Sequence, residues 1–253
     1  MTDFLEAVNL AAHQLTIFLV IPALAGLFIY LMEVWISGRL MTAFGEKAIW
    51  LTALTGTPVH EFAHAAACVL FRCRIKEIKW LTFDPDSHVL GYVTYQHQPM
   101  NPFHWIGRLV IGFAPLLVGF TIIGILFYLL PASATTDKWW MVPVEKTLSL
   151  VSGLVVWTWW QWLLAWVLLG IVVHMAPSLQ DLKGIWAGLI LIIVLLVLIN
   201  WAGKVWSFSL PSVRPVIPIM IQITGFGILI SAGYALVITL LTAPIIRIRT
   251  GHW

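Results

Sequence analysis

The chain has 253 residues; 60% are hydrophobic, 14 are Lys or Arg and 11 are Asp or Glu, which gives a formal net charge of +3. A soluble domain of this size needs far more polar surface, and two cysteines are too few for a disulfide-stapled secreted module. The charge is too small and too dispersed to indicate a nucleic-acid partner. The composition therefore predicts a multi-pass integral membrane protein.

Six apolar segments reach or approach the roughly 20 residues that a helix needs to cross the hydrocarbon core of a bilayer. We expect an all-α polytopic membrane protein with about six transmembrane helices and both termini on one side. In chain order, the segments are residues 15–35, 49–71, 104–130, 148–175, 184–199 and 217–246.

The region before the first segment, residues 1–14, carries Asp3 and Glu6 and lacks the basic start of a signal peptide. We therefore expect the first helix to stay as an anchor. Eight Lys and Arg residues fall on the side of the termini and six on the other side. This excess favours cytoplasmic termini, because cytoplasmic loops are enriched in Lys and Arg.

The longest polar loop follows the second segment and predicts a β-hairpin. Residues 74–83 alternate apolar and charged side chains, as a half-buried strand does. An Asp-Pro-Asp-Ser turn at residues 84–87 leads to a second β-branched and aromatic stretch at residues 90–95. We expect a small membrane-associated hairpin between the second and third helices.

The second segment contains the motif HEFAH at residues 60–64. His60 and His64 are one helical turn apart on the same face, so both imidazoles can reach one Zn²⁺. Glu61, beside the first histidine, can take a proton from an attacking water. Pro58 suits a first helical position, so we expect a helical turn to begin there.

Glu61 is also the one acidic residue that lies well inside a predicted span. A carboxylate at membrane depth costs roughly 3 kcal/mol, and such residues usually have a function. The alternative is a hydrogen-bonded His-Glu-His cluster that only holds helices together. The cost of an idle intramembrane carboxylate favours zinc chemistry over this alternative.

A catalytic zinc site needs a third protein ligand, and Asp181 is the best candidate. Pro177 ends the fourth segment, and the resulting break would bring Asp181 back toward the motif. As an alternative, Asp181 is an ordinary acidic residue at a helix start. His174 is the second candidate ligand, or a group that bonds the substrate or the transition state; Glu145 lies on the opposite side and is less favoured.

Three further histidines, His88, His97 and His104, lie in or beside the hairpin loop. Their spacings of nine and seven residues match no compact metal-ligand pattern. We interpret them as solvated or interfacial side chains rather than as a second metal site.

Over residues 50–190 the chain resembles the site-2 protease family of intramembrane zinc metallopeptidases. The likeness rests on the HEFAH motif, on GFAPLLVG at residues 112–119, and on the Pro-to-Gly segment at residues 177–184. Departures in the last two motifs indicate a divergent branch. The resemblance implies that His60, His64 and Asp181 bind Zn²⁺ and that Glu61 activates water.

The resemblance divides the chain into an N-terminal anchor helix and loop (1–48), a zinc metalloprotease membrane core (49–190) and C-terminal transmembrane helices (191–253). The expected activity is hydrolysis of peptide bonds in membrane-embedded or membrane-proximal proteins. The expected partners are such a substrate and the lipid bilayer, with a second copy of the chain or a regulatory membrane protein as further candidates.

Three alternatives to this activity stay open. A peptidase similar to the CAAX prenyl proteases would use a downstream Glu as third ligand, and only Glu77 and Glu145 follow His64. A catalytically inactive relative or scaffold would keep the fold without the chemistry. A transporter would fit the span count, but the sequence has no internal repeat.

Overall fold

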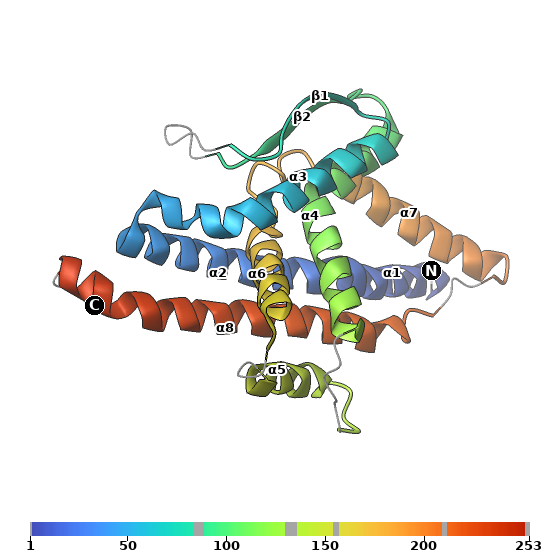
Figure 1. Ribbon diagram of the computed structural model, residues 1–253. Helices are drawn as coiled ribbons and strands as arrows, with labels where there is room; N and C mark the ends of the chain where they lie inside the picture. Colours follow the sequence, from blue (N-terminus) through green and yellow to red (C-terminus); the bar gives the residue numbers. More distant parts are fainter. Residues whose placement is uncertain (1, 83–88, 130–135, 154–156, 209–211, 251–253) are drawn as a thin grey trace.

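The computed structural model describes the chain except for residues 1, 83–88, 130–135, 154–156, 209–211 and 251–253. The described part is mostly helical and carries one small two-stranded sheet (Figure 1). Its main elements are α1 (Thr2–Leu15), α2 (Ile21–Phe44), α3 (Trp50–Leu70), β1 (Arg74–Lys79), β2 (Tyr92–Gln96), α4 (Pro102–Leu129), α5 (Val142–Gly153), α6 (Trp159–His174), α7 (Trp186–Val205) and α8 (Val216–Thr250).

In the described part of the chain, four helices are long and apolar enough to cross a membrane, by length and composition. They are the continuous helix Thr2–Phe44, which joins α1 and α2 through a π-helical turn, and Pro102–Leu129, Trp186–Val205 and Val216–Arg249. The six predicted spans are thus not confirmed as a set. Helix α3 matches the second predicted segment within one residue at each end, but its Thr, His and Glu side chains lower its mean hydropathy.

The fourth predicted segment, residues 148–175, is wrong as a single span. The structure has two separate helices there, and α5 lies across the end of α6 (Figure 1). Thr158 and Gln161 form a capping box at the start of α6, and the Thr158 amide donates to Gln161 Oε1 at 2.7 Å. This polar start signal lies within a tryptophan-rich run, so hydropathy alone does not separate the two helices.

The first predicted segment, residues 15–35, is too short. The helix extends in both directions, from Thr2 to Phe44. It ends where Gly45 takes a φ of 82°, a backbone conformation that favours glycine. The mixed polar residues that follow residue 35 are tolerated because α8 packs along α2, and Arg39 Nε donates to Thr242 Oγ1 at 2.9 Å.

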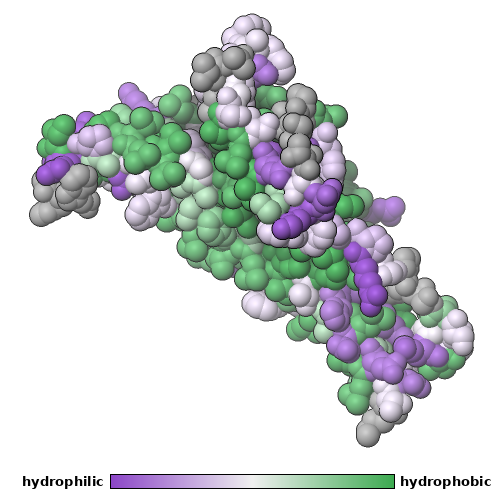
Figure 2. Space-filling model, turned by 90° about the horizontal axis from the view of Figure 1, so that it is seen from below, coloured by the Kyte–Doolittle hydropathy of each residue, from purple (hydrophilic) through white to green (hydrophobic). Residues whose placement is uncertain are grey.

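The helices run in two directions that cross each other. In Figure 1, α4 and α6 run across the long helices α2 and α8. Side chains from all four helices form the main buried cluster, which includes Ile29, Leu116, Val172 and Phe226. Many large apolar side chains outside this cluster are exposed, and apolar surface dominates the view from below (Figure 2). This surface fits a lipid environment better than water.

The predicted hairpin is present as an antiparallel pair of strands over α3 (Figure 1). Arg74 pairs with Gln96 and Lys79 with Tyr92, and the register shifts between Ile75 and Glu77. The apolar face of the hairpin packs against a buried cluster on α3 and α4. The predicted turn at residues 84–87 and His88 lie outside the described residues.

Candidate metal centre

The HEFAH motif lies in the middle of α3, where its two histidines face each other. The Nε2 atoms of His60 and His64 are 3.1 Å apart, and the ring centroids are 4.8 Å apart. The expectation that a helical turn begins at Pro58 is wrong, because α3 runs through the proline. A close contact between α3 and α6 supports this stretch: a Cβ on Gly56 would lie 2.2 Å from the carbonyl oxygen of Gly170.

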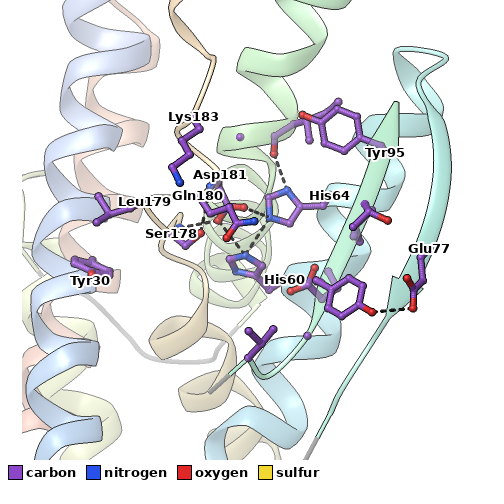
Figure 3. Close-up of a pocket in the computed structure, with 18 residues that line it drawn as sticks. Tyr30, His60, His64, Glu77, Tyr95, Ser178, Leu179, Gln180, Asp181 and Lys183 are labelled. Atoms are coloured by element: carbon purple, nitrogen blue, oxygen red, sulfur yellow. Dashed lines mark hydrogen bonds and ion pairs between the residues drawn. The ribbon is translucent and has the colours of Figure 1, made fainter. Parts of the chain in front are cut away.

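Asp181 reaches both histidines from the loop between α6 and α7. Its Oδ1 lies 3.1 Å from His64 Nε2, and its Oδ2 lies 3.6 Å from His60 Nε2 (Figure 3). One ligand atom from each of the three residues lies within 4.8 Å of the others. The alternative of a helix-start residue does not describe Asp181, because α7 begins only at Trp186.

Hydrogen bonds within a local turn and close packing against α4 hold this loop in place. The Ser178 amide donates to Asp181 Oδ2 at 2.7 Å, and the Asp181 amide donates to Ser178 Oγ at 3.2 Å. A Cβ on Gly112 would lie 2.6 Å from the backbone oxygen of Asp181. Gly184 has a φ of 82°, and a Cβ there would lie 1.5 Å from Arg108 Nη2. The glycines therefore let the loop approach α4 closely enough for Asp181 to meet the histidines.

Hydrogen bonds at the Nδ1 atoms determine that the two histidines face each other with the lone pairs of their Nε2 atoms. His60 Nδ1 lies 2.6 Å from the backbone oxygen of His174, and His64 Nδ1 lies 2.8 Å from that of Ile111. A carbonyl oxygen only accepts, so each Nδ1 carries the hydrogen and each Nε2 keeps a lone pair in the neutral ring. A hydrogen bond from the outer ring nitrogen to a backbone oxygen is typical of metal-binding histidines.

With both rings neutral, two imidazole lone pairs and a carboxylate thus converge at hydrogen-bonding distance without a hydrogen to share. Such a set of acceptors is stabilised by a cation placed among them. Two imidazole nitrogens and one carboxylate oxygen match the three protein ligands of a catalytic zinc site, which leaves one position open. The residues present therefore fit a zinc ion.

Glu61 lies in the same cavity as these three residues. Its side chain is buried, and the cavity has a volume of about 910 Å³. Figure 3 shows the cluster between the hairpin, which carries Tyr95, and α2, which carries Tyr30. Burial raises the pKa of the Tyr95 phenol, so its hydroxyl stays uncharged at neutral pH.

The hairpin backbone lies directly against Glu61. A Cβ on Gly91 would lie 2.9 Å from Glu61 Cγ and 2.8 Å from Thr57 Cγ2. A glycine inside a strand-like stretch often marks a place where another group comes close to the backbone, but the sequence does not say which group. The structure shows that the group close to Gly91 is the side chain of Glu61, the candidate base.

His174, the second candidate ligand, is near the centre but its ring faces away from the cluster. Its Nδ1 lies 3.1 Å from Glu33 Oε1, and its Nε2 lies 3.1 Å from Thr52 Oγ1. It contributes its backbone oxygen to His60 instead of a ring nitrogen to the metal group. Glu33 was missed from the sequence, because the first segment was expected to end two residues after it.

The other acidic and histidine candidates have separate partners. Glu77 lines the cavity but accepts a hydrogen bond from the Tyr92 hydroxyl at 2.7 Å. Glu145 lies on α5 and accepts from the Thr136 amide at 3.1 Å. His104 is buried rather than solvated, and its Nδ1 accepts from the Gln98 amide at 2.8 Å. None of them belongs to the ligand group in the described part of the chain.

No protein-family model matches this sequence, and comparisons with curated proteins and with solved structures found no match. Membership of the site-2 protease family therefore stays a prediction. The geometry brings together three side chains that could hold a metal ion, and a fourth ionisable group, Glu61, lines the same cavity.

Proposed function

We propose that the protein is a zinc-dependent peptidase that hydrolyses peptide bonds of membrane-embedded or membrane-proximal proteins. The observation that carries the proposal is the convergence of His60, His64 and Asp181 beside Glu61. The first three residues would hold Zn²⁺, which in such sites polarises a carbonyl and lowers the pKa of water. The alternative, an inactive or scaffold protein of the same fold, would hold the ion without hydrolysis.

Glu61 is the general base in this proposal. Its carboxylate takes a proton from the attacking water and then passes it to the leaving amine, so the residue ends each cycle ionised as it began. Burial of the side chain keeps competing water away from this transfer. Glu61 neighbours His60 in the chain and lines the cavity that the ligands share.

The cavity wall suggests how a substrate is held. Gly91 and the β2 residues from Tyr92 to Tyr95 line the cavity on one side, and β2 pairs with β1 along its other edge. A transmembrane substrate helix satisfies its own backbone, so it must unwind before a carbonyl can be attacked. An unwound segment can lie beside β2 as an added strand, with backbone hydrogen bonds in place of those lost from the helix.

The test compares wild type with Glu61→Gln, purified in detergent and incubated with a set of synthetic transmembrane peptides. Mass spectrometry reads the products and elemental analysis reads the zinc. We expect zinc in both proteins, cleavage by wild type, and at least a hundredfold slower cleavage by the variant. Glu6→Gln, a change on α1 remote from the centre, is the control and should cleave normally. Zinc without cleavage in wild type would favour the scaffold alternative.

A further inference from the structure

Glu33 places a second carboxylate inside an apolar helix, close to the metal centre. It lies in the middle of α2, which is part of the continuous apolar helix Thr2–Phe44. The same face of α2 carries Tyr30, one turn earlier, and Tyr30 lines the cavity of the centre. An acidic residue in such a helix is costly and usually has a functional partner.

The partner of Glu33 is the imidazole of His174, the last residue of α6. Glu33 Oε1 lies 3.1 Å from His174 Nδ1, and Thr52 Oγ1 of α3 lies 3.1 Å from His174 Nε2. A carboxylate only accepts, so the neutral ring carries its hydrogen on Nδ1, and Nε2 accepts from the Thr52 hydroxyl. The buried ring is therefore held from two helices at once.

The backbone of the same residue contacts the first ligand. The carbonyl of His174 is one of the last of α6, where carbonyls have no partner within the helix. It accepts from His60 Nδ1 at 2.6 Å. A bond of this kind sets the orientation of a ligating imidazole and raises the basicity of its other nitrogen. The position of this one carbonyl thus determines where His60 Nε2 points.

We propose that Glu33 is a positioning residue of the metal centre, which fixes His60 by anchoring His174. The chain of contacts runs from the Glu33 carboxylate to the His174 ring, and from the His174 carbonyl to His60 Nδ1. This inference rests on the proposed function, because it assigns Glu33 a role in holding zinc. Glu33 itself does not belong to the ligand group.

The alternative is a structural role, in which the contact between Glu33 and His174 only joins α2 to α6. A purely structural contact would change stability without changing the coordination of a bound metal. A positioning contact would change affinity and coordination even in a protein that stays folded. The variant Glu33→Leu is suited to this distinction, because leucine is favoured over glutamate in an apolar helix and so preserves folding.

The experiment measures zinc affinity by chelator competition, and the visible spectrum of the Co²⁺ form, in nanodiscs. The proteins are wild type, Glu33→Leu, His174→Leu, the double variant, and the control Glu6→Gln. Glu6 lies on the same continuous helix but pairs with Lys204, at 2.6 Å between Glu6 Oε2 and Lys204 Nζ. We expect each single variant to bind zinc about 10- to 100-fold more weakly, which is the usual effect of removing a group that holds a metal ligand in place. The Co²⁺ spectrum should change, and Glu6→Gln should match wild type.

The double variant tests whether Glu33 acts through His174. If it does, the zinc affinity of the double variant equals that of the single variant with the lower affinity, within about twofold. All three variants then lose the same contact, the one between Glu33 and His174. Multiplied losses, or an unchanged affinity and Co²⁺ spectrum in folded Glu33→Leu, would overturn the proposal.

The test of the positioning role of Glu33 can be distinguished from the test of peptidase activity. A wild type that binds zinc without cleaving peptides contradicts the peptidase and leaves the affinity comparison intact. If wild type binds no zinc, nitrogen-15 spectra of labelled histidine replace the affinity measurement. The Nδ1–H form of His60 should then be present in wild type and lost in Glu33→Leu, and its persistence in the variant contradicts the positioning role.

Discussion

His60 donates its Nδ1 hydrogen to the backbone oxygen of His174, which lies 2.6 Å away and 114 residues further along the chain. The bond joins the helix that carries two of the candidate ligands to the point where α6 ends and the Asp181 loop begins. The positions of all three candidate ligands therefore depend on the contact between α3 and α6. A change in that contact moves ligands from both segments together.

Removal of the metal should destabilise the folded protein. An ion that binds only the folded state adds about 4 kcal/mol at a concentration a thousandfold above its dissociation constant. We expect wild type to contain one zinc per chain and to unfold at a lower temperature after chelation. His60→Ala and Asp181→Ala should contain little zinc and lose the response to chelator.

His97→Ala is the control for this measurement, because His97 lies beside the hairpin and outside the ligand group. It should keep the zinc content and the chelator response of wild type. A wild-type protein with no zinc, and with the same unfolding temperature before and after chelation, would contradict the metal centre.

The sequence predicts the elements of the centre well where local signals act alone. His60 and His64 could be assigned from one motif because an i, i+4 pair is fixed by the helix itself. The end of the second segment near Phe71 was correct within one residue, because a run of charged residues follows at once. The three expected ligands do lie together, although their metal binding stays a prediction.

The missed features depend on partners that are distant in the chain. The Glu33 carboxylate is close to a predicted helix end, and only the fold places it against His174. Gly91 looks like an ordinary strand glycine until the hairpin lies over Glu61. The break before Trp159 is hidden because tryptophans flank a polar cap, and hydropathy averages across it.

Gly184→Ala should loosen the third ligand. The residue has a φ of 82°, and the added Cβ would meet Arg108 Nη2 at 1.5 Å. The left-handed conformation alone costs an alanine about 1–2 kcal/mol of stability. The Arg108 guanidinium can turn aside from the added Cβ, but it then loses its hydrogen bond to the Lys183 backbone oxygen, which is 3.5 Å long and holds the loop that carries Asp181. Zinc affinity, measured by chelator competition, should therefore fall by about tenfold, the lower end of the range for groups that support a metal ligand.

Gly45→Ala is a matched control, because Gly45 has the same φ of 82° and nothing within 4 Å of an added Cβ. It should also lose stability, because alanine rarely adopts this φ, and it should keep its zinc affinity. Equal zinc affinities in Gly184→Ala and Gly45→Ala would show that the position of the Asp181 loop does not depend on its contact with Arg108.

Gly91→Ala should impair hydrolysis while leaving the metal in place. The added Cβ would lie 2.9 Å from Glu61 Cγ and 2.9 Å from the backbone oxygen of Lys79, so either the base or the hairpin must move. A displaced base costs part of the 10²- to 10⁴-fold contribution that proton transfer makes. We therefore expect a cleavage rate at least tenfold lower at saturating peptide, with normal zinc content. Gly38→Ala, with nothing within 4 Å of its Cβ, should cleave at the wild-type rate. A normal cleavage rate in Gly91→Ala would mean that the hairpin can lift away from Glu61 during turnover and that this contact does not position the base.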